Sequence, residues 1–485
     1  MSGAREITSA ETAGSGGGAE SQSPFASDDL NDALAQAAAV DPGSETPAAG
    51  KLGQVVKNAG VLLGGKTINA VISLGYMGVS AHYLGLDAMG AMVLINAFAM
   101  AVGEVAKFQS WQAVLHYGAR PLNEGRIGDF QRVVRLSLLL DLASAIVGVI
   151  IGVAGIHFFG QVLRWPPEAV PIGTFYAFSI AFMVAATPTG VLRLFDRFDV
   201  LAIQSGVSSV VRLAGALLVM VMDWGLEGMA VAWFLGNVAA LVYLFGSAWQ
   251  ALTVRELLKG FRWRGVGFAS DFPGFWRFVW STNLTATLDL AFTHVGTLTV
   301  GALTGPGPAA LFRIARQVSD ALAKPAKLVV AALYPELARM WSVGDQKGLV
   351  KLAIQVGLIG GAVATVLLLV ASLFGRPFLG FVMGHQFEAA APVMTWLVAA
   401  AAIGVWALPF EPMLISTGRA GSAVIVRLVV SALYLAALFP AVRMHGLIGA
   451  GVAEVAASIL MFTGMLIPVL RWYRAPSAGA PDRLN

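Results

Sequence analysis

The chain has 485 residues, of which 57% are hydrophobic and 12% are charged, and its formal net charge at pH 7 is +4. Because a soluble domain carries about 25% charged residues, this composition excludes an ordinary soluble protein and predicts an all-α integral membrane protein with many spans. The absence of cysteine excludes disulfide and thiol chemistry.

The first segment, residues 1–50, differs from the rest of the chain. It consists mainly of Gly, Ser, Ala and Thr, with eight acidic residues against the single arginine Arg5. It lacks a basic start followed by an apolar core, so it is not a signal peptide. We predict a disordered acidic cytoplasmic tail. Two interpretations remain open: a solvated tail of little function, or a segment that binds a partner.

Twelve apolar segments follow, each near the ~20 residues that cross a bilayer. We place them at 58–82, 87–107, 134–158, 169–192, 200–222, 228–250, 277–301, 308–332, 350–374, 389–414, 421–442 and 448–471. The even-numbered connections hold most of the Lys and Arg residues. The positive-inside rule therefore predicts that both termini are cytoplasmic.

A basic linker at 253–275 divides the chain into two bundles of six helices, 51–252 and 276–474, and a short cytoplasmic tail follows at 475–485. Phe261 and Trp263 lie among the basic residues of this linker. We expect this mixture to lie on the anionic inner leaflet rather than on nucleic acid.

The two halves resemble each other. GLEGMAVA at 225–232 recurs as GLIGAGVA at 446–453, and Gly85 with EVAKF at 104–108 aligns with Gly305 and KPAKL at 324–328. VVRLAGALL around Arg212 also matches IVRLVVSAL around Arg427. Because each half has an even number of spans, the repeat is parallel, with a pseudo-twofold axis along the membrane normal.

The eighth segment carries a stripe of charge. In LFRIARQVSDALAKPAKL (311–328) the charges are 3, 4, 4 and 3 residues apart, which places all five within roughly 80° of the helix circumference. They are Arg313, Arg316, Asp320, Lys324 and Lys327. Each costs at least about 2.5 kcal/mol in hydrocarbon, so we expect the stripe to face a watery cavity, a partner charge or an ion.

The repeat divides this stripe. Lys327 aligns with Lys107, which leads into a basic loop, so we expect Lys327 to reach the membrane surface, where long side chains snorkel to the headgroups. Arg316 and Asp320 align with the uncharged Asn96 and Met100. The ionic face therefore belongs to the C-terminal half alone.

Other ionisable residues also lie within spans. Those that need an explanation include Lys66, Asp141, Arg212, Asp289, Glu411, Arg427 and Glu454. Arg212 and Arg427 occupy matching motifs, and we favour a shared structural role for them over substrate contact. The acids at 141, 411 and 454 lie near span ends, where a structural role is also favoured. Lys66 and Asp289 lie well inside the first span of each half, where they are candidates for lining a cavity.

Nothing in the sequence predicts catalysis. The six histidines are scattered without metal-ligand spacing, and no GxxxxGK[ST] phosphate-binding motif occurs. We therefore expect neither enzyme activity nor a metal or cofactor.

Three stretches resemble a known family. VLRLFDRFDVLA at 191–202, the R-x-x-R face leading to LYPELA within 311–340, and the L-G-x-x-x-x-G turn in HYLGLDAMG at 82–90 are similar to stretches of bacterial polysaccharide flippases. The resemblance covers roughly 55–475. It points to the O-antigen, capsule or exopolysaccharide branch of the multidrug/oligosaccharidyl-lipid/polysaccharide (MOP) exporter superfamily.

This resemblance implies a flippase in the bacterial cytoplasmic membrane. Such a protein moves a polyprenyl-diphosphate-linked oligosaccharide, a lipopolysaccharide or exopolysaccharide precursor, from the inner to the outer leaflet by alternating access. Membrane lipids and a polysaccharide polymerase are the other candidate partners, and protons or sodium the candidate coupling ions.

The charged residues fit this implied work. We expect Arg313, Arg316, Lys324 and Lys66 to form a cationic cleft for the diphosphate, because Arg forks bind phosphate oxygens. Asp320 would orient its basic neighbours and, with Asp289 or Glu104, carry a coupling proton.

Two alternatives remain open. A cation-coupled multidrug exporter of the same superfamily would have an acidic and aromatic cleft. A membrane scaffold for a polysaccharide-synthesis complex would tolerate neutralisation of the stripe.

Overall fold

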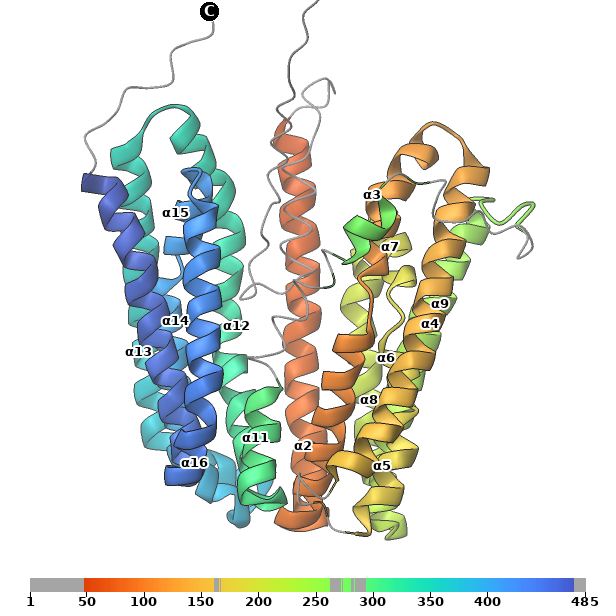
Figure 1. Cartoon of the computed structure of the whole chain (residues 1–485), viewed down its shortest axis with the longest axis vertical. Helices are drawn as coiled ribbons and strands as arrows, with labels where there is room; N and C mark the ends of the chain where they lie inside the picture. The colour runs from red at the N-terminus through yellow and green to blue at the C-terminus, as the bar shows by residue number, and fades with distance from the viewer. Residues whose placement is uncertain are drawn as a thin grey trace, which may run out of the picture.

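The computed structural model describes residues 48–474 except 161–164, 166, 262–271, 273, 281–282 and 284–293. Within these ranges every regular element is a helix, which confirms the all-α membrane fold (Figure 1). In chain order the helices are α2 (Ala48–Ala106), α3 (Ser110–Asn123), α4 (Ile127–Phe159), α5 (Ala169–Ala177), α6 (Ile180–Met183), α7 (Thr187–Leu194), α8 (Phe198–Met222), α9 (Gly225–Val254), α11 (Val295–Thr304), α12 (Pro306–Ser342), α13 (Gln346–Met383), the 3-10 helix η2 (His385–Ala390), α14 (Ala391–Ala407), α15 (Phe410–Ser416) and α16 (Ala420–Arg474).

Eight helical stretches in the described part of the chain are long and apolar enough to cross a membrane. Two of them, Asn69–Asn123 and Gly421–Arg474, each cover two of the expected segments. The reason is that α2 and α16 each contain one glycine outside the helical region, Gly85 with φ 73° and Gly446 with φ 58°. Each of these two elements is therefore a hairpin of two helices (Figure 1).

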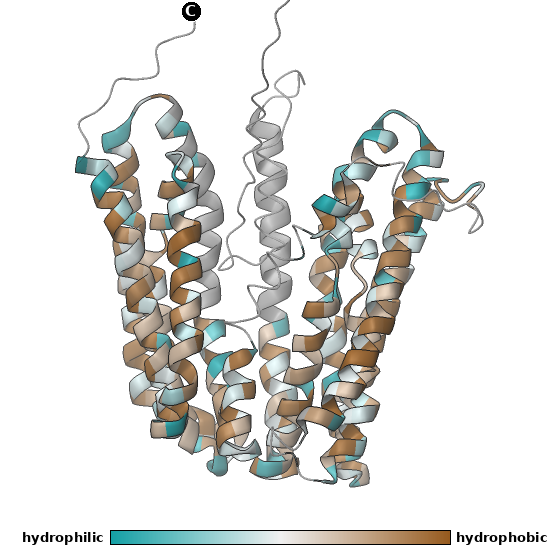
Figure 2. Cartoon of the chain, viewed as in Figure 1, coloured by the Kyte–Doolittle hydropathy of each residue, from teal (hydrophilic) through white to brown (hydrophobic). Residues whose placement is uncertain are grey.

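The helices form two groups that converge at one end and diverge towards the other (Figure 1). α3–α9 lie in one group, the N bundle, and α11–α16 in the other, the C bundle. α2 lies between them and packs against α8 and α12. We call the converging end, which contains Gly85, the narrow end, and the end near Arg474 the wide end. Hydrophobic residues dominate the long helices, whereas hydrophilic residues gather at the turns (Figure 2).

Backbone geometry confirms the parallel repeat. Turns with positive φ occur in pairs at offsets of 219 to 222 residues, because corresponding helices end in the same way in both halves. The pairs are Gly85 and Gly305, Gly125 and Gly344, Asp196 and Gly418, and Gly225 and Gly446. These markers also show that the match between Arg212 and Arg427 was wrong, because its offset is only 215. Arg212 instead falls within one residue of Tyr434. Short apolar motifs recur by chance in helices of such limited composition.

Lys107 lies at the start of the non-helical stretch 107–109 that follows the end of α2 at Ala106, as predicted. Most of the loop expected beyond it is instead helical, because α3 carries the chain on to Asn123. α3 is amphipathic and buries Trp111 and Val114, so polar residues in this stretch mark an exposed helical face rather than a loop. α12 likewise continues to Ser342. The side chain of Lys327 lies outside the described residues, so its expected position at the membrane surface stays a prediction.

Asp141 of α4 holds the broken fourth segment together. Its buried carboxylate accepts hydrogen bonds from the backbone N–H groups of Ala186 (3.0 Å) and Thr187 (2.8 Å), where α7 begins, and from Ser110 Oγ (2.5 Å). A helix start leaves N–H groups that need acceptors, and Asp141 supplies them from a neighbouring helix. The expected structural role of Asp141 is confirmed.

Replacing Asp141 with Ala is expected to lower the free energy of unfolding by about 3 kcal/mol, because each buried N–H left unpaired costs about 1–3 kcal/mol. Thermal unfolding of the detergent-solubilised protein measures this loss. Ser144→Ala is the matched control: Ser144 is buried on the same helix, and its Oγ has no hydrogen-bond partner in the described structure. Equal unfolding temperatures for the two variants would contradict the capping role.

Candidate functional site

The charged stripe lies on α12, which packs against α2, α11 and α14. Ile314 and Ala315 are fully buried, whereas Arg313, Arg316 and Asp320 are partly exposed. The helix therefore buries its apolar side and presents these three charges together. The side chains of Lys66, Lys324 and Lys327, and the whole of Asp289, lie outside the described residues.

Arg316 is neutralised by two carboxylates. Its Nη1 donates to Glu454 Oε1 of α16 at 2.5 Å, and its Nε donates to Asp320 Oδ1 at 3.2 Å. The hydroxyl of Tyr434 donates to the other oxygen of Glu454 at 3.4 Å. The side chains of Arg316 and Glu454 are 16% and 15% exposed, and that of Asp320 is 48% exposed. The role of Asp320 beside a basic neighbour thus has a geometric basis, and Glu454 is the stronger partner.

Arg313 has a different environment. It makes no hydrogen bond or ion pair with any residue that the structure describes. It lies within electrostatic range of Arg212 and Tyr76 on the N-bundle side and of Asp320 on its own helix. A partly buried guanidinium without a carboxylate in contact favours an external anion.

Arg212 of α8 is the cation on the N-bundle side. Its Nη2 donates to Asn237 Oδ1 at 2.6 Å, its Nη1 donates to the hydroxyl of Tyr76 at 3.3 Å, and its guanidinium lies 5.2 Å from the Trp233 ring centroid. No described carboxylate pairs with it. Amide, phenol and indole groups therefore hold Arg212 in place without cancelling its charge.

A neutral network supports Arg212. Asn237 Nδ2 donates to the Tyr176 hydroxyl at 3.4 Å, and that hydroxyl donates to Asn96 Oδ1 at 2.9 Å. All three side chains are buried. The network connects Arg212 with α2, and satisfied buried networks of this kind are rigid.

The two halves use equivalent positions differently. Asn96, Arg212 and Trp233 in the N-terminal half correspond to Arg316, Tyr434 and Glu454 in the C-terminal half, to within one residue. The N-terminal set carries one positive charge without a described carboxylate in contact, whereas the C-terminal set contains a closed ion pair. Arg212 and Glu454 were predicted to be structural and not to be site residues. One signal was available: Arg212 has no acid within three turns of its own helix.

The remaining candidates lie elsewhere. Glu104 approaches Lys107 at 4.0 Å, and no described contact joins it to the α12 stripe. Arg427 Nη1 lies 3.4 Å from Glu411 Oε1, which supports the structural roles expected for both residues. His294, buried just before α11, lies within electrostatic range of Arg313, Arg316 and Asp320. No group of His, Asp or Glu that could hold a metal occurs among the described residues.

Glycines close the narrow end. A Cβ on Gly90 would overlap the backbone of Pro306, and one on Gly78 would lie 2.5 Å from the carbonyl oxygen of Val382. A Cβ on Gly307 would lie 2.9 Å from Asp87 Oδ1. Each pair joins α2 to a C-bundle helix. Gly90 and Gly78 approach backbone atoms and Gly307 approaches a side-chain oxygen; we call these three close approaches the glycine seam, and they favour residues without side chains.

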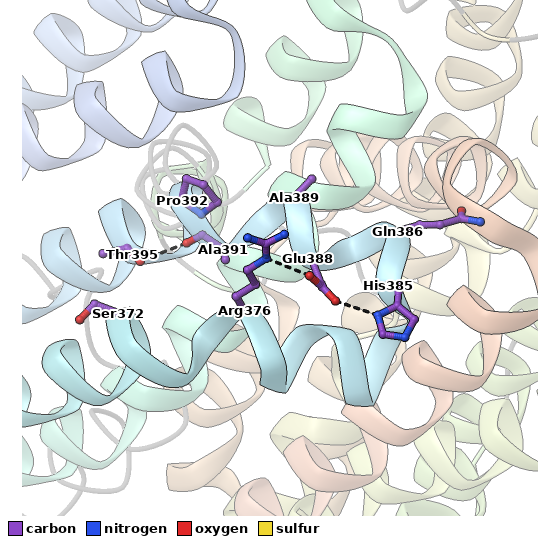
Figure 3. A pocket seen from close by; sticks show the side chains of 9 residues that line it. All are labelled: Ser372, Arg376, His385, Gln386, Glu388, Ala389, Ala391, Pro392 and Thr395. Carbon is purple, nitrogen blue, oxygen red and sulfur yellow. Dashed lines mark hydrogen bonds and ion pairs between the residues drawn. The ribbon is translucent and has the colours of Figure 1, made fainter.

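A cleft of about 560 Å³ lies beside this seam, where α13, η2 and α14 meet (Figure 3). Glu388 points between Arg376 Nε and His385 Nδ1, each at 2.8 Å. Gln386 reaches the other way, and its Oε1 accepts a hydrogen bond from the backbone N–H of Leu86 at 3.1 Å. Through Gln386, a residue that lines the cleft is thus hydrogen-bonded to α2 at the narrow end.

Comparisons with known proteins give the fold a context. No protein-family model matches the sequence. The chain is 28% identical over 333 residues to the inner membrane protein YghQ of Escherichia coli K12, covering 69% of this chain and 93% of that protein.

Two solved structures superpose well on the chain. An inward-facing multidrug resistance MATE transporter of the MOP superfamily gives a TM-score of 0.64 at 14% identity, covering 85% of this chain and 95% of that one. The lipid II flippase MurJ in an inward closed conformation gives 0.62 at 14% identity, covering 84% and 86%. The chain thus has the all-helical fold of MOP-superfamily transporters.

Proposed function

We propose that this protein is a flippase that carries a polyprenyl-diphosphate-linked oligosaccharide from the inner to the outer leaflet of the bacterial cytoplasmic membrane. The observation that carries the proposal is the pair formed by Arg212 and Arg313. These cations belong to opposite bundles, lie within electrostatic range of each other, and have no carboxylate in contact among the described residues. A diphosphate supplies the negative charge that such a pair lacks.

The topology gives the proposal a direction. With both termini cytoplasmic, as the positive-inside rule predicts, the wide end faces the cytoplasm and the glycine seam lies on the opposite side. The diphosphate would then enter from the inner leaflet, with its polyprenyl tail left in lipid between the bundles. The similarity to MurJ and to an E. coli inner membrane protein supports this location.

Arg316 takes a supporting place in this proposal. Its two carboxylate partners compensate its charge, so Arg313 and Arg212 attract the anion first. Lys66 and Lys324 remain proposed contributors to the same cationic cleft, and Asp320, Asp289 and Glu104 remain proposed coupling or orienting groups. A drug-cation exporter is less well supported, because uncompensated arginines repel cationic drugs.

A deletion strain tests the function. Loss of the gene is expected to deplete the surface glycan and to accumulate its lipid-diphosphate-linked precursor in the cytoplasmic membrane, both measured by mass spectrometry of extracted lipids. Complementation with the wild-type chain should reverse both effects. A deletion strain with normal glycan and no precursor accumulation would contradict the flippase assignment. A scaffold is distinguished by complementation with Arg313→Ala, which it would tolerate.

A further inference from the structure

The ion pair between Arg316 and Glu454 joins two helices of the C bundle, α12 and α16. Both side chains are largely buried, and their atoms approach to 2.5 Å. Among the described residues, Arg316 is the only cation in contact with Glu454. Whatever removes Arg316 from this pair leaves the carboxylate of Glu454 without a counter-charge.

The position of Arg316 exposes it to such competition. It lies one helical turn from Arg313, on the same face of α12, so an anion that contacts Arg313 is within reach of Arg316. A diphosphate offers several oxygens to one guanidinium and can replace a carboxylate. The cost of an unpaired buried carboxylate is several kcal/mol, and such a group relieves it by binding a proton.

We propose that Glu454 is the proton acceptor that couples anion binding to proton uptake. When a diphosphate takes the donors of Arg316, the freed Glu454 carboxylate binds one proton from water. When the anion leaves, Arg316 returns to Glu454 and the proton is released. This inference rests on the proposed function. It assigns proton coupling to Glu454, which was not among the predicted coupling residues Asp320, Asp289 and Glu104.

The neighbours of Glu454 are consistent with this assignment. Asp320 on α12 is about half exposed, so water solvates its charge when Arg316 moves. Tyr434 on α16 donates to Glu454 and stabilises the carboxylate without balancing its charge. His294, before α11, is buried and lies within electrostatic range of Arg313, Arg316 and Asp320. α14 has no ionisable residue, and Glu411 of α15 is paired with Arg427.

The linkage has a definite sign. Since the anion-bound state holds one more proton than the free state, a fall in pH tightens anion binding. The transported species is also less negative by one charge than the diphosphate alone. A Gln at position 454 needs no proton when Arg316 leaves, so Glu454→Gln removes this contribution.

Calorimetry tests the inference with the full chain in lipid nanodiscs and farnesyl diphosphate as the probe. Titrations in two buffers of different ionisation enthalpy at one pH give the number of protons taken up. The wild type is expected to take up about one proton more than Glu454→Gln. Glu411→Gln, which alters a different carboxylate–arginine pair of the bundle, should match the wild type. Equal uptake by the wild type and Glu454→Gln would overturn the inference alone, whereas absence of binding to the wild type would overturn the proposed function as well.

Infrared difference spectroscopy of the wild type gives a second test that needs no variant. Addition of farnesyl diphosphate should produce the absorption of a newly protonated carboxyl group. If the probe binds and this band is absent, Glu454 does not take up the proton and the inference fails.

Discussion

Replacing Arg313 with Ala is expected to weaken binding of farnesyl diphosphate by roughly 10- to 100-fold, because a hydrogen bond to a charged group contributes about 1.5–3 kcal/mol and each 1.4 kcal/mol is tenfold in affinity. The fold should be unaffected, since Arg313 makes no hydrogen bond or ion pair with a described residue. Titration of the purified variant in nanodiscs, followed by tryptophan fluorescence, measures the affinity, and thermal unfolding measures the stability.

Two controls separate charge from general effects. Arg313→Lys keeps the charge but loses the planar fork, so its affinity should lie between those of the wild type and Arg313→Ala. Arg443→Ala removes an exposed arginine near the kink of α16 and should bind like the wild type. A folded Arg313→Ala variant with wild-type affinity would remove the main support for the anion site.

Replacing Gly90 with Leu is expected to prevent closure of the narrow end and to abolish transport. The side chain would occupy the space of the Pro306 backbone, with Gly307 N also within 2.9 Å of the new Cβ, and backbone atoms cannot move aside cheaply. The two bundles must therefore separate there. A single cysteine at Leu94, which is fully buried and contacts Gly301 across the seam, reports the change.

Because the chain has no native cysteine, labelling of Leu94→Cys by an impermeant maleimide is free of background. The thiol should be protected in the otherwise wild-type protein and become reactive when Gly90→Leu is added. Gly75→Leu is the matched control, since a Cβ on Gly75 meets no atom within 4 Å. If the thiol stays protected in the Gly90→Leu protein, closure of the narrow end does not require a residue without a side chain at position 90.

The helical fold could be predicted from the sequence because hydropathy and turn glycines act locally. Long apolar runs specify spans, and Gly85 and Gly305 mark equivalent turns that the repeat already contained. α3 escaped prediction because a helix with one polar face has the same average hydropathy as a loop. Its buried side comes from packing on α4 and α7, which local composition does not record.

The candidate site could be predicted only in part, because charge compensation is a long-range property. The spacing of Arg313, Arg316 and Asp320 placed them on one face of a helix, as the structure has them. Spacing could not reveal that Glu454, 138 residues away, compensates Arg316 while Arg313 contacts no described carboxylate. The role of Arg212 was obscured for a related reason, since a chance motif match aligned it with Arg427.

The glycine seam has a consequence for the electrical properties of the membrane. A protein that moves a bulky lipid-linked sugar through its centre must still insulate the membrane against small ions. At Gly78 and Gly90 one helix backbone meets another, so these two positions have no side chain of their own that could change rotamer and admit a file of water. A seal formed by contact between two helix backbones has two states: the backbones touch and block ions, or they separate and do not. Glycine, which has no side chain, thus helps to maintain the membrane potential.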